Sequence, residues 1–212
     1  MKKEEYLEIW DWNTGEPTGQ SVERKFSHRS GIPHEGVQLW IYRALNGFIE
    51  LLFQKRSASK DLYPSVLDIS VSGHVPFGLT AGKIEKEAEE ELGIIINEKD
   101  LEYLGVFRYE ETVPENDLFH REFQKIWVMK NDFPADIYTF NDGEVEAVCF
   151  VSMDDFRKLL NGGTGTIDSE YYDGRMYRKL LSIENFHPLF FSGQMKSYLD
   201  AVFGGIEALE LG

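Results

Sequence analysis

Cysteine, clustered positive charge and long apolar runs are what this sequence has least of. Its single cysteine, Cys149, excludes an intramolecular disulfide and a zinc site built from several cysteines. The 212 residues carry 22 Lys and Arg against 37 Asp and Glu, and this net charge of -15 argues against binding to a nucleic-acid backbone. The chain has no uncharged apolar stretch of signal-peptide or membrane-spanning length. We therefore expect a cytoplasmic protein that binds neither nucleic acid nor membranes.

The rest of the composition fits a folded globular protein, with 42% hydrophobic and 28% charged residues. The apolar patterning predicts mixed strands and few helices, which indicates an α+β fold with layered elements. Asn46-Gly47 is a strong hairpin signal between the first two strands. We expect strands at 37–44, 49–54, 66–71, 101–109, 122–129 and 144–151, helices at 83–92 and about 153–160, a loop at 73–82 and a turn cluster at 161–168.

The chain is expected to divide into a core and two additions. Residues 1–36 are polar and turn-rich and are interpreted as an N-terminal extension. Residues 37–160 hold the convincing strands and the two helices, and they are the predicted catalytic domain. Residues 161–212 are predicted to be a partly helical appendage, packed on the same domain and most helical near 193–203.

The predicted helix from Lys83 to Leu92 is the most informative segment, and Gly93 follows it where a helix C-cap belongs. Glu87, Glu90 and Glu91 are related as i, i+3 and i+4, so they share one arc of the helix beside its apolar stripe. A solvated acidic helix would explain them, but like charges at this spacing destabilise a helix. A hard divalent cation such as Mg²⁺ or Mn²⁺ would relieve the repulsion, and carboxylate oxygens suit it.

This segment resembles the signature of the Nudix family, a loop and helix that carry spaced glutamates. The similarity implies an α/β/α sandwich with a mixed sheet, and hydrolysis of a diphosphate linked to some group X. It also implies Mg²⁺ or Mn²⁺ held by Glu87, Glu90, Glu91 and the Gly73 carbonyl. Two departures stand out: Leu79 replaces the first expected glutamate, and one residue is missing between loop and helix.

A second similarity, over roughly residues 10–155, is to the isopentenyl diphosphate isomerase-like branch of the same fold. The isomerases use a His-rich metal site and a catalytic cysteine, and Ser72 occupies the cysteine position here. A hydroxyl is a poor substitute for a thiol in proton transfer at an alkene carbon, which favours a hydrolase that lost the isomerase chemistry. The segments that carry the similarity are His28, His34, residues 54–60, residues 68–74 and Glu122, and His120 lies where the isomerases have a metal-binding acid.

The remaining candidates concern substrate and proton transfer. Arg56 and Lys60 lie four residues apart after a strand, where a guanidinium and an ammonium can meet one diphosphate. His74 follows Gly73 directly and is a candidate for a metal ligand or for substrate contact. The general base that activates water is left open among Glu87, Glu122 and the loop acids Glu110, Glu111 and Glu115, and Glu91 is expected to be essential for turnover.

Taken together, the sequence predicts a Nudix-type enzyme that hydrolyses the pyrophosphate bond of a small-molecule diphosphate with Mg²⁺ or Mn²⁺. Isomerisation of a prenyl diphosphate is one alternative, and Ser72 is the residue against it. A module that binds a nucleotide or diphosphate without cleaving it is another, favoured by Leu79 and the shortened loop. A homodimer is left open, with the segment from Tyr171 as a candidate interface.

Overall fold

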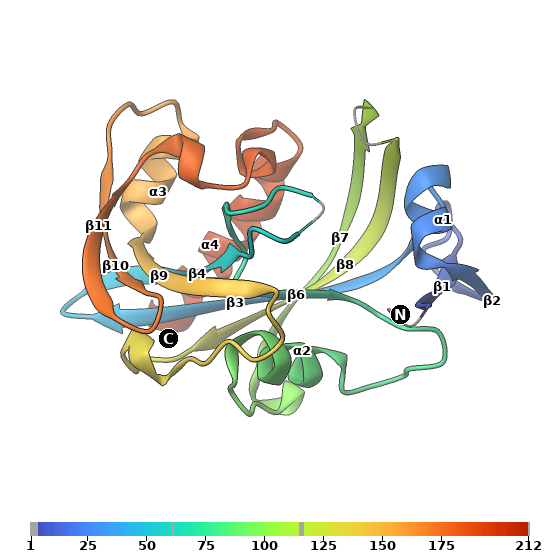
Figure 1. Cartoon of the computed structure of the whole chain (residues 1–212), viewed down its shortest axis with the longest axis horizontal. Helices are drawn as coiled ribbons and strands as arrows, with labels where there is room; N and C mark the ends of the chain where they lie inside the picture. Colours follow the sequence, from blue (N-terminus) through green and yellow to red (C-terminus); the bar gives the residue numbers. More distant parts are fainter. Residues whose placement is uncertain (1–3, 61, 115–116, 212) are drawn as a thin grey trace.

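The computed structural model describes residues 4–60, 62–114 and 117–211. In this part of the chain a nine-stranded mixed sheet runs in the order β11-β10-β9-β4-β3-β8-β7, with β5 paired to β4 and β6 paired to β3. Helix α2 lies on one side of the sheet, and α3 and α4 lie on the other (Figure 1). The predicted α+β class and the α/β/α layering are confirmed.

The centre of the sheet follows the predicted hairpin. Strands β3 (His34–Leu45) and β4 (Phe48–Arg56) pair antiparallel, and Asn46 and Gly47 make the turn with φ of 53° and 83°. Both turn residues need positive φ, which is why Asn-Gly favours this connection. Strand β8 (Leu118–Lys130) adds parallel to β3, and β7 (Glu102–Val113) adds antiparallel to β8. The other core strands are β5 (Leu67–Asp68), β6 (Val71–His74) and β9 (Val145–Ser152).

Alternation along β3 divides the core into two clusters. Leu39 and Ile41 pack on the face covered by α2 (Lys83–Leu92), and Trp40 and Tyr42 pack on the opposite face. This is the period-two pattern of a strand buried on both sides. The opposite face is covered by α3 (Met153–Leu160) and α4 (Met195–Leu211). Four short 3-10 helices connect elements in the described residues: η1 (Glu98–Asp100), η3 (Ala135–Ile137), η4 (Ile183–Asn185) and η5 (Pro188–Phe191).

The N-terminal residues form more regular structure than the sequence predicted. Strands β1 (Tyr6–Trp10) and β2 (Pro17–Glu23) pair as a separate hairpin, and α1 (Arg24–Ser30) follows directly. Trp10 and Trp12 pack against Phe123 of β8 with ring centroids 5.5 and 5.1 Å away, and the Arg108 guanidinium lies 4.4 Å over Trp12. These aromatic and cation–π contacts hold the hairpin beside β8, and α1 lies next to β8 as well (Figure 1).

The C-terminal residues contain two strands besides the predicted helix. Strands β10 (Ile167–Tyr172) and β11 (Met176–Leu181) form an antiparallel hairpin, and β10 pairs with β9, so this segment extends the central sheet. Asp173-Gly174 between two aromatic-rich runs is the hairpin signal that identifies it. The predicted helix near 193–203 is present and longer, as α4.

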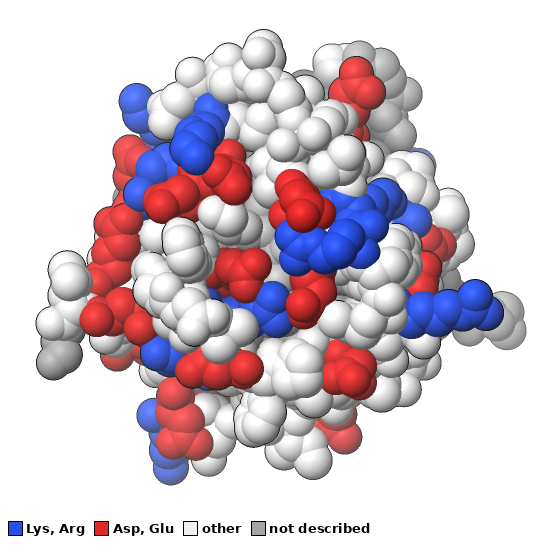
Figure 2. Space-filling model, turned by 90° about the vertical axis from the view of Figure 1, so that its left-hand side faces the viewer, with Lys and Arg blue, Asp and Glu red and all other residues white. Residues whose placement is uncertain are grey.

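Charged side chains on the surface are largely interspersed. On the face shown in Figure 2, acidic side chains lie beside Lys and Arg side chains. Ion pairs such as Lys55–Glu146 and Arg178–Asp168 illustrate this arrangement. Among residues 4–60, 62–114 and 117–211, no helix combines the length and the hydropathy that crossing a bilayer requires.

Candidate active site and metal centre

Strand β6 brings the two halves of the candidate site together. Gly73 and His74 were expected in a loop, but they lie in β6, where Gly36 of β3 pairs with His74. This long-range pairing overrides the loop preference of the glycine and proline residues nearby. His74 therefore shares a face with His34 of β3, whereas Gly73 faces α2, where an added Cβ would lie 2.5 Å from the Glu87 carboxyl carbon.

Helix α2 spans the predicted residues Lys83–Leu92, and Gly93 caps it with φ of 67°. Glu91 is only 3% exposed and accepts hydrogen bonds from the Ser72 N–H at 3.1 Å and from Gln54 Nε2 at 3.3 Å. Glu87 lies against Gly73 and pairs with Lys83 one turn earlier. Two of the three predicted carboxylates thus point toward β6.

The third carboxylate is arranged differently from the expectation. The Glu90 side chain is 46% exposed and pairs with Lys86 on the outside of α2. The i, i+3, i+4 arc is wide enough for Glu87 and Glu91 to turn inward while Glu90 stays at the solvent edge.

Burial changes the protonation of the inward carboxyls. It raises the pKa of Glu91 well above the usual value, and the neighbouring Glu87 carboxylate acts in the same direction. Burial also raises the pKa of Glu87, against the opposing effect of Lys83. A cation placed between these two carboxylates would reverse both shifts, which makes the pair suitable for a divalent ion.

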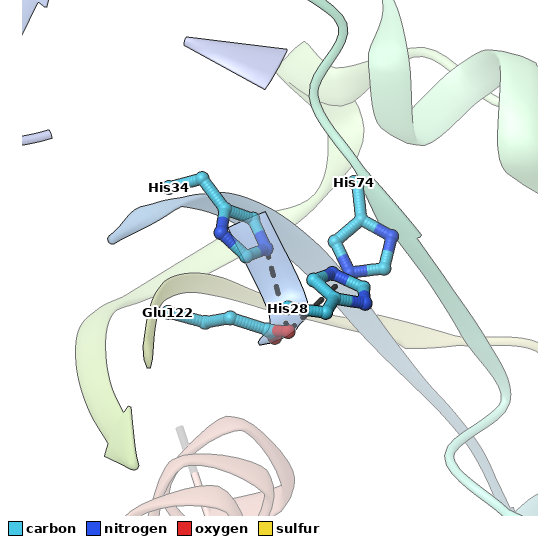
Figure 3. A group of neighbouring side chains, drawn as sticks. All are labelled: His28, His34, His74 and Glu122. Atoms are coloured by element: carbon cyan, nitrogen blue, oxygen red, sulfur yellow. Dashed lines mark hydrogen bonds and ion pairs between the residues drawn. The ribbon is translucent and has the colours of Figure 1, made fainter. Parts of the chain in front are cut away.

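A second group of possible metal ligands lies on the other face of β6. His28, His34, His74 and Glu122 each offer one ligand atom, and these atoms all lie within 4.8 Å of one another. The four side chains converge from α1, β3, β6 and β8 (Figure 3). Glu122 Oε1 lies 3.5 Å from His34 Nε2, 3.3 Å from His74 Nε2 and 3.4 Å from Nδ1 of the neighbouring His120.

Local structure orients His28 and His34. Glu23 caps α1 at its N-terminus, and Gly31 ends it with φ of 62°, which places Ser27 and His28 on its buried side. His34 Nδ1 lies 3.0 Å from the Ile32 carbonyl oxygen, which can only accept a hydrogen bond. His34 therefore carries its proton on Nδ1, and its Nε2 lone pair faces Glu122 and the other imidazoles.

The protonation states of His28, His74 and Glu122 are those that bind a metal ion. Burial, assisted by His74 and His120, lowers the pKa of His28 to about 2. Burial likewise lowers the pKa of His74 to about 4, despite the opposing Glu122 carboxylate. Burial alone would raise the pKa of Glu122, but hydrogen bonds from His120 and His74 hold it well below its usual value. Neutral imidazoles and an ionised carboxylate are the forms that coordinate metals.

The histidine–glutamate group also contains buried nitrogen atoms that a metal ion could bind. Within the described ranges, the buried Nε2 atoms of His28 and His34 have no hydrogen-bond partner. Buried polar atoms without partners are costly in a folded protein. A cation coordinated by both nitrogens would satisfy them, and imidazole with carboxylate is a common donor set for divalent transition metals.

Arg56 and Lys60, the two residues predicted to bind the diphosphate, form ion pairs within the protein. The Arg56 guanidinium pairs with Asp68 at 3.1 Å and donates hydrogen bonds to the carbonyl oxygens of Leu62 and Tyr63. Lys60 pairs with Glu144. These contacts organise the loop between β4 and β5, so phosphate binding would require both cations to exchange partners.

The loop acids have separate positions. Glu110 pairs with Arg121 on the surface of the β7–β8 hairpin. Glu111 accepts hydrogen bonds from the hydroxyls of Tyr63 and Tyr109. Glu115 lies outside the described residues.

Sequence reasoning missed the residues that support the ligands. Ser27 contacts His34 Nδ1 at 3.0 Å, and the buried Gln54 and Gln124 donate to Glu91 and Glu122. The signal available for both glutamines was a polar residue at an inward position of an otherwise apolar strand.

Comparisons with known proteins concern the family and the fold of the chain. Residues 33–170 match the family model described as NUDIX domain. The chain is 28% identical over 192 residues to an uncharacterized Nudix hydrolase of Clostridium acetobutylicum, a match covering 88% of this chain and 91% of the relative. It is 32% identical over 161 residues to Nudix hydrolase 3 of Arabidopsis thaliana, covering 74% of this chain and 20% of the relative. This chain thus spans about a fifth of the length of the Arabidopsis protein.

Two further matches concern the isomerase similarity and the fold. The chain is 32% identical over 127 residues to isopentenyl-diphosphate Delta-isomerase 1 of Photorhabdus laumondii, which covers 57% of this chain and 69% of the relative. A crystal structure of a Deinococcus radiodurans protein superposes with a TM-score of 0.52 at 20% identity, covering 75% of this chain and 90% of that one. The latter shows a shared fold.

Proposed function

This chain belongs to the Nudix family and is related within it to the isopentenyl-diphosphate isomerases, and we propose that it is a metal-dependent hydrolase of a small organic diphosphate. One observation carries the proposal. Strand β6 has two acidic groups beside it, Glu87 and Glu91 on the α2 side and Glu122 with three histidines on the other. A diphosphate bound at this strand would meet both groups.

The two groups suit different cations. His28, His34, His74 and Glu122 would hold a divalent transition-metal ion rather than Mg²⁺, because imidazole nitrogen predominates there. Glu87 and Glu91, with the Gly73 carbonyl, offer oxygen ligands that suit Mg²⁺ or Mn²⁺. Glu90 is retained as an outer ligand that would have to leave Lys86. When bound, the cations would polarise the phosphoryl oxygens as Lewis acids.

The side chains supply the proton transfer. Water forms a bond to one phosphorus, the bond from that phosphorus to the bridging oxygen breaks, and the bridging oxygen leaves on the other phosphate. Glu87 is our candidate for the base that takes the proton from water, because its half-buried carboxylate lies against Gly73 of β6. Glu91, held by the Ser72 N–H, would be fixed as a ligand. Glu122 is the alternative base.

Two basic side chains would neutralise the negative charge of the bound diphosphate. Arg56 and Lys60 remain our proposal for the diphosphate, with Asp68 and Glu144 exchanged for phosphate oxygens on binding. His74 would act mainly as a ligand rather than as a substrate contact, because its Nε2 faces Glu122.

Isomerisation of a prenyl diphosphate is the second candidate. The relationship to a Photorhabdus isomerase and the histidine–glutamate group favour it, and Ser72 in place of a cysteine opposes it. Incubation with isopentenyl diphosphate in deuterated water separates the two, since only an isomerase exchanges carbon-bound hydrogen.

A metal-supplemented screen tests the main proposal. The full chain is incubated with Mg²⁺ or Mn²⁺ and a panel of nucleoside, sugar-nucleotide, dinucleotide and cofactor diphosphates, and products are identified by mass spectrometry. We expect cleavage between the two phosphorus atoms of at least one compound, abolished by a chelator. Tight binding by calorimetry without any product would instead favour a binding module.

A further inference from the structure

Gln124 of β8 is a buried glutamine that contacts the proposed metal ligand Glu122. Only 8% of Gln124 is exposed, and its Nε2 donates a hydrogen bond to Glu122 Oε2. We propose that Gln124 is a positioning residue that occupies one oxygen of Glu122 and reserves the other for the metal ion. The inference rests on the metal centre of the proposed function and extends it to the residue that sets the ligand geometry.

The two oxygens of Glu122 have different surroundings. Oε1 faces the nitrogens of His34, His74 and His120 at 3.3 to 3.5 Å. Oε2 receives the Gln124 amide instead. An amide donor on one oxygen leaves a single oxygen for the cation, so Glu122 would bind through one atom and in one orientation.

The sheet makes room for this contact at Gly36. His34 pairs with Glu122 and Gly36 pairs with Gln124 along the parallel strands β3 and β8, so all four residues lie on the same face. A Cβ on Gly36 would lie 2.4 Å from the Gln124 amide oxygen. Any side chain at position 36 would therefore push the Gln124 amide away from Glu122.

A similar arrangement occurs on the other side of β6. Gln54 of β4 is 2% exposed, and its Nε2 lies 3.3 Å from Glu91 Oε2. Each proposed metal group therefore has one buried glutamine that donates to one of its carboxylates. This makes Gln54 a matched control, because its removal costs a buried amide without touching Glu122.

Loss of the Gln124 amide should weaken metal binding. Without the donor, Glu122 Oε2 stays buried and unpaired, and the carboxylate is free to rotate away from the histidines. Removal of such outer-shell partners typically lowers metal affinity by about 10- to 100-fold.

The test is a titration of the full chain with Co²⁺, followed by calorimetry and by the visible absorption that reports nitrogen ligands. Gln124→Met keeps the side-chain length without the donor, and it should weaken Co²⁺ binding by about 10- to 100-fold. Gln54→Met, which touches Glu91 on the opposite face of β6, should leave the absorption that reports nitrogen ligands of Co²⁺ unchanged. In a Glu122→Gln background, adding Gln124→Met should have little further effect.

Gly36→Ala provides a second route to the same displacement and should weaken Co²⁺ binding in the same direction. An unchanged Co²⁺ affinity in both Gln124→Met and Gly36→Ala, while His74→Ala loses binding, overturns the positioning role alone. An equal loss from Gln124→Met with and without Glu122 also overturns it. Equal Co²⁺ binding by the wild-type chain and His74→Ala overturns the metal centre itself, and with it the proposed function.

Discussion

His34 and Glu122 stand directly opposite each other on the parallel strands β3 and β8, and His34 Nε2 lies 3.5 Å from Glu122 Oε1. Side chains on a strand alternate between faces, so a slip of one residue would turn Glu122 into the α2 face. The histidine–glutamate group is therefore a product of sheet register, with α1 adding His28 and β6 adding His74.

Metal removal should lower the thermal stability of the folded chain. A ligand at about 100 times its Kd stabilises the native state by about 2.7 kcal/mol, and a chelator should abolish that gain. We expect Mn²⁺ or Co²⁺ to raise the unfolding midpoint of the wild-type chain but not of His74→Ala. His187→Ala, which removes a buried histidine outside the group, should keep the shift. Scanning fluorimetry with and without chelator measures this, and an equal shift in His74→Ala would contradict it.

Gly31→Ala should disturb α1 and the histidine that it carries. Gly31 has φ of 62°, and an added Cβ would lie 2.3 Å from the Phe119 ring. Gly19→Ala is the control, because Gly19 has φ of 74° with open space around it. Left-handed strain of roughly 1–2 kcal/mol should affect both variants, but only Gly31→Ala should also lose metal affinity. Urea unfolding measures the loss of stability, and metal titration measures the loss of affinity. Equal metal affinity in Gly31→Ala and Gly19→Ala would show that Gly31 does not position His28.

Tyr198→Phe should destabilise the core without touching either metal group. The buried Tyr198 hydroxyl accepts from Trp40 Nε1 and donates to Gln38 Oε1, both at 2.6 Å. Leaving the Trp40 N–H unpaired should cost about 1–3 kcal/mol of unfolding free energy. Tyr103→Phe, at a position that is 48% exposed, should change it by less than about 0.5 kcal/mol. Equal urea midpoints for the two variants would count against the buried network.

His187 should make stability depend on pH. Burial lowers the pKa of His187 in the folded chain, and its Nδ1 accepts a hydrogen bond from the Leu189 N–H at 3.2 Å. The unfolded chain therefore binds the proton first as pH falls. The contribution of neutral His187 to the free energy of unfolding is therefore fully present above about pH 6.5. It is lost as pH falls from there toward the pKa of the folded chain.

His187→Asn keeps an acceptor at the start of η5 but does not titrate. Its unfolding free energy should fall less steeply than that of the wild-type chain between about pH 6.5 and 5. Urea unfolding at several pH values measures this dependence. If the unfolding free energy of both proteins fell equally with pH, His187 would not be a source of the pH dependence.

Local patterns were enough to predict the elements that depend on nearby residues. The α2 boundaries follow from strong helix formers ended by Gly93, and the β3–β4 turn follows from Asn46-Gly47. The β10–β11 hairpin is not among the predicted elements although Asp173-Gly174 marks it, because the polar residues around this turn obscure the alternation of a strand.

The site required pairings that no local pattern contains. His28, His34, His74 and Glu122 come from four elements, and only the β3–β6 and β3–β8 registers bring three of them to one face. Resemblance pointed to these residues, but their separation from Glu87 and Glu91 by β6 emerged only from the structure. Glu90 lies at the solvent edge of the helical arc, and the i, i+3, i+4 spacing alone does not show which edge faces β6.

The central claim is that Glu91, buried beside β6, is required for metal-dependent cleavage of a diphosphate. The most direct measurement is kcat/KM with Mg²⁺ on a substrate found in the screen, for Glu91→Gln beside Glu89→Gln, an exposed position on the same helix. We expect a loss of at least about 100-fold for Glu91→Gln, comparable to the loss of a transition-state contact, and wild-type activity for Glu89→Gln. Full Mg²⁺-dependent turnover in Glu91→Gln would contradict it.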